Sequence, residues 1–153
     1  MLCVSTLAIN QLIEVTITLI RSYSDLRRLE TFKDRYKYLE LNGRIGEATF
    51  GFDRWINQQF YTSREWRNLR HHVIARDLGC DMGVDGFEIH SGLYIHHMNP
   101  VTRDQIVEGD PSILDPEFLI TVTHKTHNAI HYGDERLLPR PLVDRKPGDT
   151  KLW

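Results

Sequence analysis

Cysteine is scarce in this chain of 153 residues, since only Cys3 and Cys80 are present. Two cysteines exclude a disulfide framework, and nothing requires an oxidising compartment. Proline and glycine are near average and no short period recurs, which excludes collagen-like, solenoid and low-complexity classes. A long apolar run is also missing, because polar residues interrupt positions 1–20, so neither a signal peptide nor a membrane span is expected. The length predicts one soluble, cytoplasmic domain without a membrane partner.

Charge is distributed unevenly, although the formal net charge is only −2. Residues 21–76 hold twelve Lys and Arg against seven Asp and Glu, whereas residues 77–153 hold seven against thirteen. The basic half favours a polyanionic partner such as a nucleic acid, and solvated helix faces are the alternative explanation. Ten of the twelve cations are arginine, which suits bidentate phosphate contacts better than lysine does.

The first third of the chain has a helical pattern. Apolar residues recur at three- and four-residue steps from Ser24 to Leu41, which predicts one or two amphipathic helices, with Thr31 as the cap of a second one. The aromatic stretch Phe50–Tyr61 fits either a packed loop or a short helix. We expect residues 1–60 to form a helical, aromatic-rich N-terminal extension.

A longer helix is predicted from about Ser63 to Asp77. Thr62 and Glu65 have the spacing of a capping box, and Gly79 is placed to end the helix. Arginines three residues apart lie on one side of it, and together with one arginine further along the chain they are the candidates for nucleic-acid contact: Arg64, Arg67, Arg70 and Arg103. A merely solvated helix face is the alternative.

Strand patterns appear only in the second half. Residues 87–98 predict two short strands joined in a hairpin at Ser91-Gly92, and residues 118–123 predict a third strand. A short helix should follow from about His124 to Tyr132. The fold class is therefore α+β, with the strands and this helix, together with the helix before them, in a domain at 61–135.

The remaining residues, 136–153, hold three prolines without periodicity. They predict an extended C-terminal tail.

Four of the eight histidines form a pattern at the ends of these elements. His127 and His131 are four residues apart, so they project from one face of the predicted helix, a spacing that lets two imidazoles share a metal ion. His96, in the pair His96-His97, can complete a site with three protein ligands and open positions, which is typical of catalytic metal sites. His124 lies on the same helical stripe and is the rival ligand.

The order of strands, helix and histidines resembles the HNH, or ββα-metal, endonuclease family. The matching stretch runs from about Arg76 to Gly133, and RDLGC, YIHHMNP and DPEFLITVTHKTHNAIHYG are most similar to small HNH proteins of bacteriophages and bacteria. The resemblance implies one divalent ion (Mg, Mn, Ni or Zn) on His96, His127 and His131, with His97 as general base. It also implies DNA, in double-stranded form, as the substrate, in the host cytoplasm if the chain is encoded by a phage.

The sequence departs from the family pattern in two respects. Phe118 stands where the family has the asparagine that orients the general base, so Asn99, Asn128 or a backbone carbonyl would have to replace it. The zinc-knuckle positions fall on Cys80, Gly83, Thr123 and Thr126, so no structural zinc is expected. Packing from residues 1–60 would take its place.

Two other functions compete with a DNA endonuclease. The HNH scaffold can persist as a nucleic-acid-binding module of weak or no catalytic activity, because the motif asparagine is missing. Alternatively, the histidines can serve only as a metal clip that stabilises a structural protein, in which case salt-dependent DNA binding would be absent.

Overall fold

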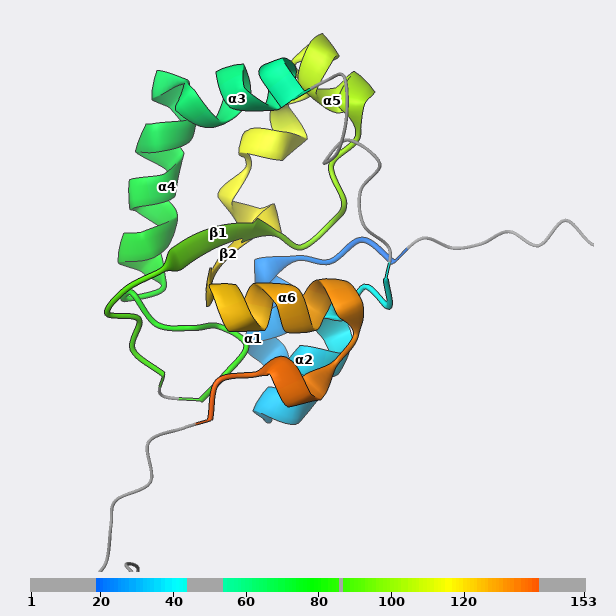
Figure 1. The fold of residues 1–153 in the computed structure, drawn as a ribbon, viewed down its shortest axis with the longest axis vertical. Helices are drawn as coiled ribbons and strands as arrows, with labels where there is room; N and C mark the ends of the chain where they lie inside the picture. Colours follow the sequence, from blue (N-terminus) through cyan, green and yellow to red (C-terminus); the bar gives the residue numbers. More distant parts are fainter. Residues whose placement is uncertain (1–18, 44–53, 86, 141–153) are drawn as a thin grey trace, which may run out of the picture.

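The computed structural model describes residues 19–43, 54–85 and 87–140. Its centre is a two-stranded antiparallel sheet of β1 (Leu93–His97) and β2 (Leu119–Thr123), with Leu93 opposite Thr123 and His97 opposite Leu119. Helix α4 (Arg64–Arg76) packs on one face of this sheet and helix α6 (His124–Tyr132) on the other (Figure 1). The fold is mixed helix and sheet, which confirms the α+β class.

Two short helices follow the start of the described chain, α1 (Tyr23–Arg28) and α2 (Phe32–Leu39). The side chain of Thr31 accepts a hydrogen bond from the backbone N–H of Asp34, so of the one or two helices predicted, two form, and Thr31 caps the second as predicted. The hydroxyl of Tyr36 donates to the carbonyl of Ala129 in α6 over 3.0 Å. This N-terminal block therefore supports the helix that carries His127 and His131.

The predicted capping box of Thr62 and Glu65 does not form. Helix α3 (Arg54–Thr62) extends to that residue, and the Thr62 hydroxyl donates to the carbonyl of Gln58 within α3. Ser63 takes over as the cap of α4, because its hydroxyl accepts from the backbone N–H of Trp66. Of the aromatic stretch, residues 50–53 lie outside the described residues, and the remainder is helical.

The predicted hairpin within residues 87–98 is also wrong, because only β1 forms there and its partner is β2. The backbone of the residues before β1 bonds elsewhere: Asp81 N–H donates to the Phe87 carbonyl, and Ile89 N–H donates to the Gly79 carbonyl. This local pairing leaves no free strand beside β1, so the sheet has two strands in the described part of the chain.

The segment between β1 and β2 contains α5 (Arg103–Glu108) and two turns of 3-10 helix, η2 (Pro111–Leu114) and η3 (Pro116–Phe118). Because Phe118 ends η3, the strand begins one residue later than predicted. After α6, which ends at Gly133 in the left-handed region as expected, comes η4 (Glu135–Leu137). Leu137 is therefore helical rather than extended, and residues 141–153 lie outside the described residues.

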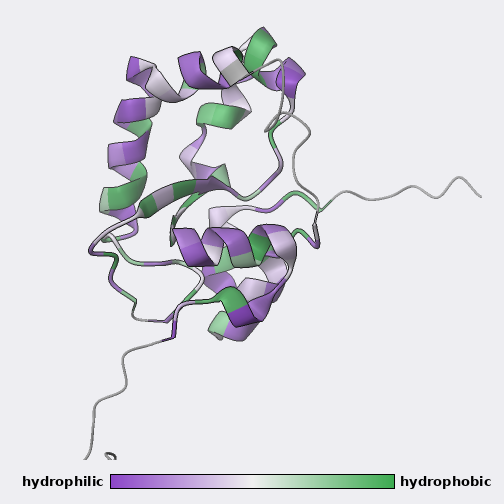
Figure 2. Ribbon diagram, viewed as in Figure 1, coloured by the Kyte–Doolittle hydropathy of each residue, from purple (hydrophilic) through white to green (hydrophobic). Residues whose placement is uncertain are grey.

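The apolar core is split by the sheet into two parts. One lies under α6 and the N-terminal helices and includes Leu26, Leu39, Val122 and Ile130, all fully buried. The other lies under α4 and is built around Trp66. Figure 2 shows hydrophilic and hydrophobic residues side by side on α4 and α6, as expected for helices with one buried face.

A hydrogen-bond network centred on Asp81 links three of the positions that the resemblance assigns to a zinc knuckle: Gly83, Thr123 and Thr126. One oxygen of the buried Asp81 carboxylate accepts from the backbone N–H of Gly83 (2.9 Å), and the other accepts from the N–H of Thr123 (2.9 Å) and the hydroxyl of Thr126 (2.6 Å). A Cβ at Gly83 would lie 2.6 Å from Cγ2 of Thr126, so the two segments are in close contact. Asp81 therefore ties the chain after α4 to the start of α6.

Replacing Asp81 with asparagine should destabilise the protein. The amide presents an N–H₂ group to donors that the carboxylate now satisfies, and an unsatisfied buried donor costs about 1–3 kcal/mol. Urea unfolding at pH 7 measures the loss. Asp85→Asn, at an exposed position four residues on, is the matched control and should change the free energy of unfolding by no more than about 0.5 kcal/mol. Equal stability of the two variants would contradict the structural role of Asp81.

Candidate metal centre

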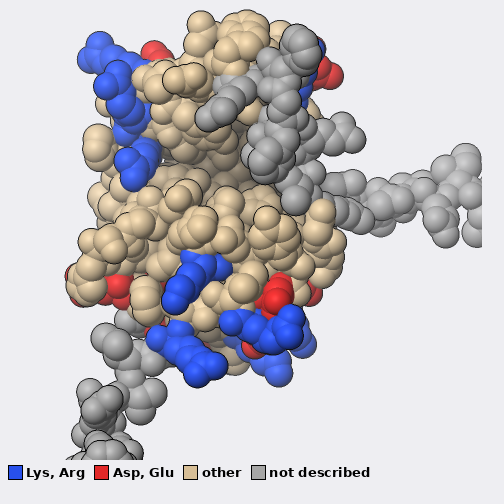
Figure 3. All heavy atoms as spheres, in the orientation of Figure 1, with Lys and Arg blue, Asp and Glu red and all other residues tan. Residues whose placement is uncertain are grey.

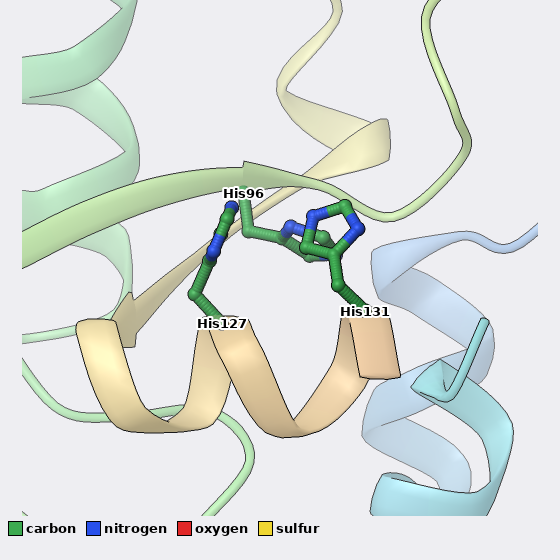
Figure 4. A group of neighbouring side chains, drawn as sticks. All are labelled: His96, His127 and His131. Carbon is green, nitrogen blue, oxygen red and sulfur yellow. The ribbon is translucent and has the colours of Figure 1, made fainter. Parts of the chain in front are cut away.

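Three histidines from two elements meet between β1 and α6 (Figure 4). His96 comes from the strand, and His127 and His131 come from one face of the helix, as their spacing predicts. One ring nitrogen of each lies within 4.8 Å of the corresponding nitrogens of the other two. We call these residues the histidine triad.

The triad has the chemistry of a metal site. His96 Nε2, His127 Nδ1 and His131 Nδ1 are buried and have no hydrogen-bond partner among the described residues. Buried polar atoms are nearly always paired, so three orphaned nitrogens facing one another need an explanation. Neutral imidazole nitrogen is the commonest metal ligand, and three protein ligands leave coordination positions for water or substrate. The residues therefore fit a divalent cation.

Burial keeps the triad neutral. It lowers the pKa of His96 well below the usual value, with the nearby His127 and His131 adding to the effect. Burial also lowers the pKa of His127, and it lowers that of His131 to about 4. Neutral rings keep the lone pair that a metal ion needs, so at pH 7 no proton has to leave before the ion binds.

The metal-free protein should lose stability as the pH falls below about 6.5, the ordinary histidine pKa. The folded-state pKa values are lowered, so between pH 6.5 and the folded values the unfolded chain binds more protons, and the free energy of unfolding falls with falling pH. Urea unfolding between pH 7.5 and 5 measures this slope. His131→Gln should make it shallower, whereas His90→Gln, at an exposed position, should leave it unchanged. A flat wild-type profile would contradict the burial argument.

His97 lies on the other face of β1, as the alternation of a strand requires. Its ring stacks on Trp66, with centroids 5.3 Å apart and planes at 15°, and its Nε2 lies 3.0 Å from the carbonyl oxygen of Ile113. A carbonyl can only accept, so Nε2 carries the proton and the neutral ring keeps its lone pair on Nδ1. Burial lowers the pKa of His97, and the bond to Ile113 opposes that shift. The strand ends at His97.

Neither asparagine considered as a base orienter is hydrogen-bonded to His97 in the described structure. The side chain of Asn99 makes two hydrogen bonds with the backbone of Arg21. Its amide oxygen accepts from the Arg21 N–H (2.8 Å), and its amide nitrogen donates to the Arg21 carbonyl (2.9 Å). Asn128 Nδ2 lies 3.5 Å from Nε2 of His124. The hydrogen bond that His97 does make is the remaining alternative, a backbone carbonyl, which belongs to Ile113. No sequence signal marks Ile113, because any residue supplies a carbonyl.

A cavity of about 530 Å³ adjoins His97. It is lined by residues 19–21 and 40–42, by the chain after β1 and by η2, and Phe118 is part of its wall. The volume is within the range of ligand-binding pockets. Part of its wall, residues 40–42, belongs to the segment whose backbone bonds to α6, because Leu41 N–H donates to the Ile130 carbonyl. Small molecules and water can therefore approach His97 at the end of β1.

The arginines predicted for nucleic-acid contact separate into two places. Arg64, Arg67 and Arg70, which we call the arginine row, are exposed on α4, and Figure 3 shows basic side chains gathered over this helix at the upper left. Arg103 begins α5 and does not belong to the row. His124, the rival ligand, lies outside the triad and packs its ring against Tyr94 at 5.2 Å.

None of the described helices has the length and apolar character needed to cross a bilayer. Comparison with known protein families, with curated proteins and with solved structures gives no match to this chain.

Proposed function

We propose that the protein is a metal-dependent endonuclease of the HNH type that hydrolyses phosphodiester bonds in DNA. The observation that carries this proposal is the histidine triad, with three orphaned nitrogens, next to a strand-end histidine held by a backbone carbonyl. Three neutral ligands with open positions favour a catalytic over a closed structural site. The family resemblance of the strand and helix motifs supports the same reaction.

His97 is the general base in this proposal. Its lowered pKa leaves the ring neutral at pH 7, and the Ile113 carbonyl holds Nε2–H so that Nδ1 is the basic atom. His97 takes a proton from the attacking water at Nδ1. The stack on Trp66 restricts rotation of the ring. A divalent ion held by His96, His127 and His131 would supply Lewis-acid stabilisation of the charge on the phosphate and on the leaving 3′ oxygen.

The arginine row is the proposed contact to the DNA backbone. DNA affinity should fall linearly with the logarithm of salt concentration, with a slope of about −0.9 for each phosphate contacted. Replacing Arg64, Arg67 and Arg70 together with glutamine should make that slope shallower by up to about 3. Fluorescence anisotropy with a labelled duplex at several salt concentrations measures it. The matched control replaces three basic residues of α1 and α2: Arg27, Arg28 and Lys33. Equal slopes for the two triple variants would show that the row is only a solvated face.

A second function, a DNA-binding module without catalysis, is favoured by one observation. His97 faces Trp66 rather than the triad, so the base and the metal ligands lie on opposite faces of β1. Cleavage therefore requires the phosphate to lie at the end of β1, where it can contact both His97 and a metal ion held by the triad.

Supercoiled plasmid distinguishes the two functions. The protein is incubated with plasmid and separate divalent ions, namely Mg²⁺, Mn²⁺, Ni²⁺ and Zn²⁺, and in parallel with chelator. The endonuclease predicts relaxed or linear plasmid with at least one ion and none with chelator. Salt-dependent binding without cleavage with any ion would favour the binding module. Metal binding without any DNA affinity would favour the structural clip.

A further inference from the structure

An exposed tyrosine stands next to the triad. Tyr94 precedes His96 by two residues on β1, so both side chains lie on the same face of the strand. Its ring contacts the ring of His127, with centroids 5.6 Å apart. Tyr94 is 43% exposed, whereas His96 is 2% exposed. Tyr94 thus provides a large aromatic surface to solvent within contact distance of a metal ligand.

His124 lies beside this tyrosine. It is the first residue of α6 and is exposed, and its ring packs against Tyr94 at 5.2 Å. Its nitrogens are outside the triad, so the side chain is not needed to complete that ligand set. Tyr94 and His124 therefore form an exposed aromatic pair where the start of β1 meets the start of α6.

The arginine row ends close to this pair. Nη2 of Arg70, the last arginine of the row, lies 3.5 Å from the carbonyl oxygen of Leu93, the residue before Tyr94. Figure 1 shows the start of β1 and the start of α6 on the same side of the molecule as α4. Arg70 consequently lies close to the aromatic pair, and Tyr94 of that pair contacts His127 of the triad.

We propose that Tyr94 and His124 bind a nucleotide near the cleaved phosphodiester, on a DNA path that runs along the arginine row, crosses the start of β1 and continues to the end of that strand, where His97 lies. This inference rests on the proposed function and adds to it the path that the DNA follows across the protein. Arginine side chains contact successive phosphates, an exposed aromatic ring packs on a sugar or base, and an imidazole N–H donates to a phosphate oxygen.

Tyr94→Ala and Tyr94→Phe test the aromatic contact. Tyr94→Ala should weaken binding of a labelled duplex by about 5-fold or more in the presence of chelator, the lower end of the range for loss of one aromatic contact to a nucleotide, and Tyr94→Phe should bind like wild type. Tyr132→Ala is the matched control, because Tyr132 is 61% exposed at the far end of α6. Calorimetry with Ni²⁺ alone is the second measurement. A tyrosine that only shields His127 would weaken Ni²⁺ binding and leave duplex binding unchanged, which would overturn the inference.

Photochemical cross-linking tests the path directly and without turnover. A duplex carrying 5-iododeoxyuridine is irradiated in complex with the protein, and the modified peptides are identified by mass spectrometry. Adducts at Tyr94 or His124 support the inference, whereas adducts confined to Tyr132 or to the cavity beside His97 overturn it. Wild-type protein that binds and cleaves DNA while Tyr94→Ala is unaffected overturns the inference alone. Wild-type protein that does not bind DNA overturns the proposed function as well.

Discussion

Replacing His131 with alanine is expected to remove metal binding and DNA hydrolysis together while the secondary structure persists. The ring contributes one of three nitrogens to the triad, and two ligands from one strand and one helix hold an ion far less tightly. We expect a loss of metal affinity greater than the roughly 10- to 100-fold that removal of an outer hydrogen-bond partner of a ligand causes. The helix should remain, because its backbone bonds and its buried face, Ala129 and Ile130, are unchanged.

Calorimetry with Ni²⁺ or Zn²⁺, metal content and circular dichroism measure these effects. His124→Ala is the matched control from the same helix and should bind the ion at wild-type stoichiometry. Chelator should remove the ion from wild-type protein without unfolding it, because the two apolar cores do not depend on the triad. Unfolding on chelation would show that the ion is structural. Loss of metal from the His124 variant, with retention in the His131 variant, would place the site one turn earlier on α6.

Replacing His97 should separate the two properties: DNA hydrolysis is lost and metal binding is kept. Loss of a general base lowers the rate by about 10²- to 10⁴-fold. His97 lies on the other face of β1 from His96, so its removal leaves the triad in place, and metal affinity should stay within a few fold of wild type.

Packing loss has to be separated from loss of the base. His97→Ala also removes the ring that stacks on Trp66, so His97→Phe is the sharper variant, because it keeps an aromatic ring there and removes both nitrogens. His71→Ala, on the exposed side of α4, is the control for general loss of a histidine. Plasmid cleavage and calorimetry are measured on all three. If metal binding disappeared in His97→Phe, the residue would be a ligand and the roles of the histidines would have to be reassigned. Full activity of that variant would exclude His97 as the base.

The triad was predictable because its information is local. The i, i+4 spacing of His127 and His131 fixes their common face in any helix, and Gly133 marks the end of that helix in the sequence. The partner His96 required only that a strand pack on the helix. The pair at Thr31 and Asp34 was equally local, whereas at Thr62 the same pattern failed because the preceding helix extended over it.

The environment of His97 was not predictable in the same way. Its hydrogen bond goes to a backbone carbonyl sixteen residues away, and its stacking partner Trp66 comes from a different helix. Carbonyls carry no sequence signature, and ring stacking depends on how two elements pack. The hairpin at 87–98 failed for a related reason, since turn signals at Ser91-Gly92 say nothing about which strand competes for the pairing.

The sequence by itself determined the α+β class and the identity of the three histidines that come together. It also determined four helices, because amphipathic spacing and caps act within a few residues along the chain: Tyr23–Arg28, Phe32–Leu39, Arg64–Arg76 and His124–Tyr132. The tertiary structure alone decided that β1 pairs with β2, that Asp81 joins Thr123 and Thr126, and that Ile113 holds His97. Each of these contacts links residues at least sixteen positions apart. Such contacts depend on the packing of whole elements, which a local pattern does not encode.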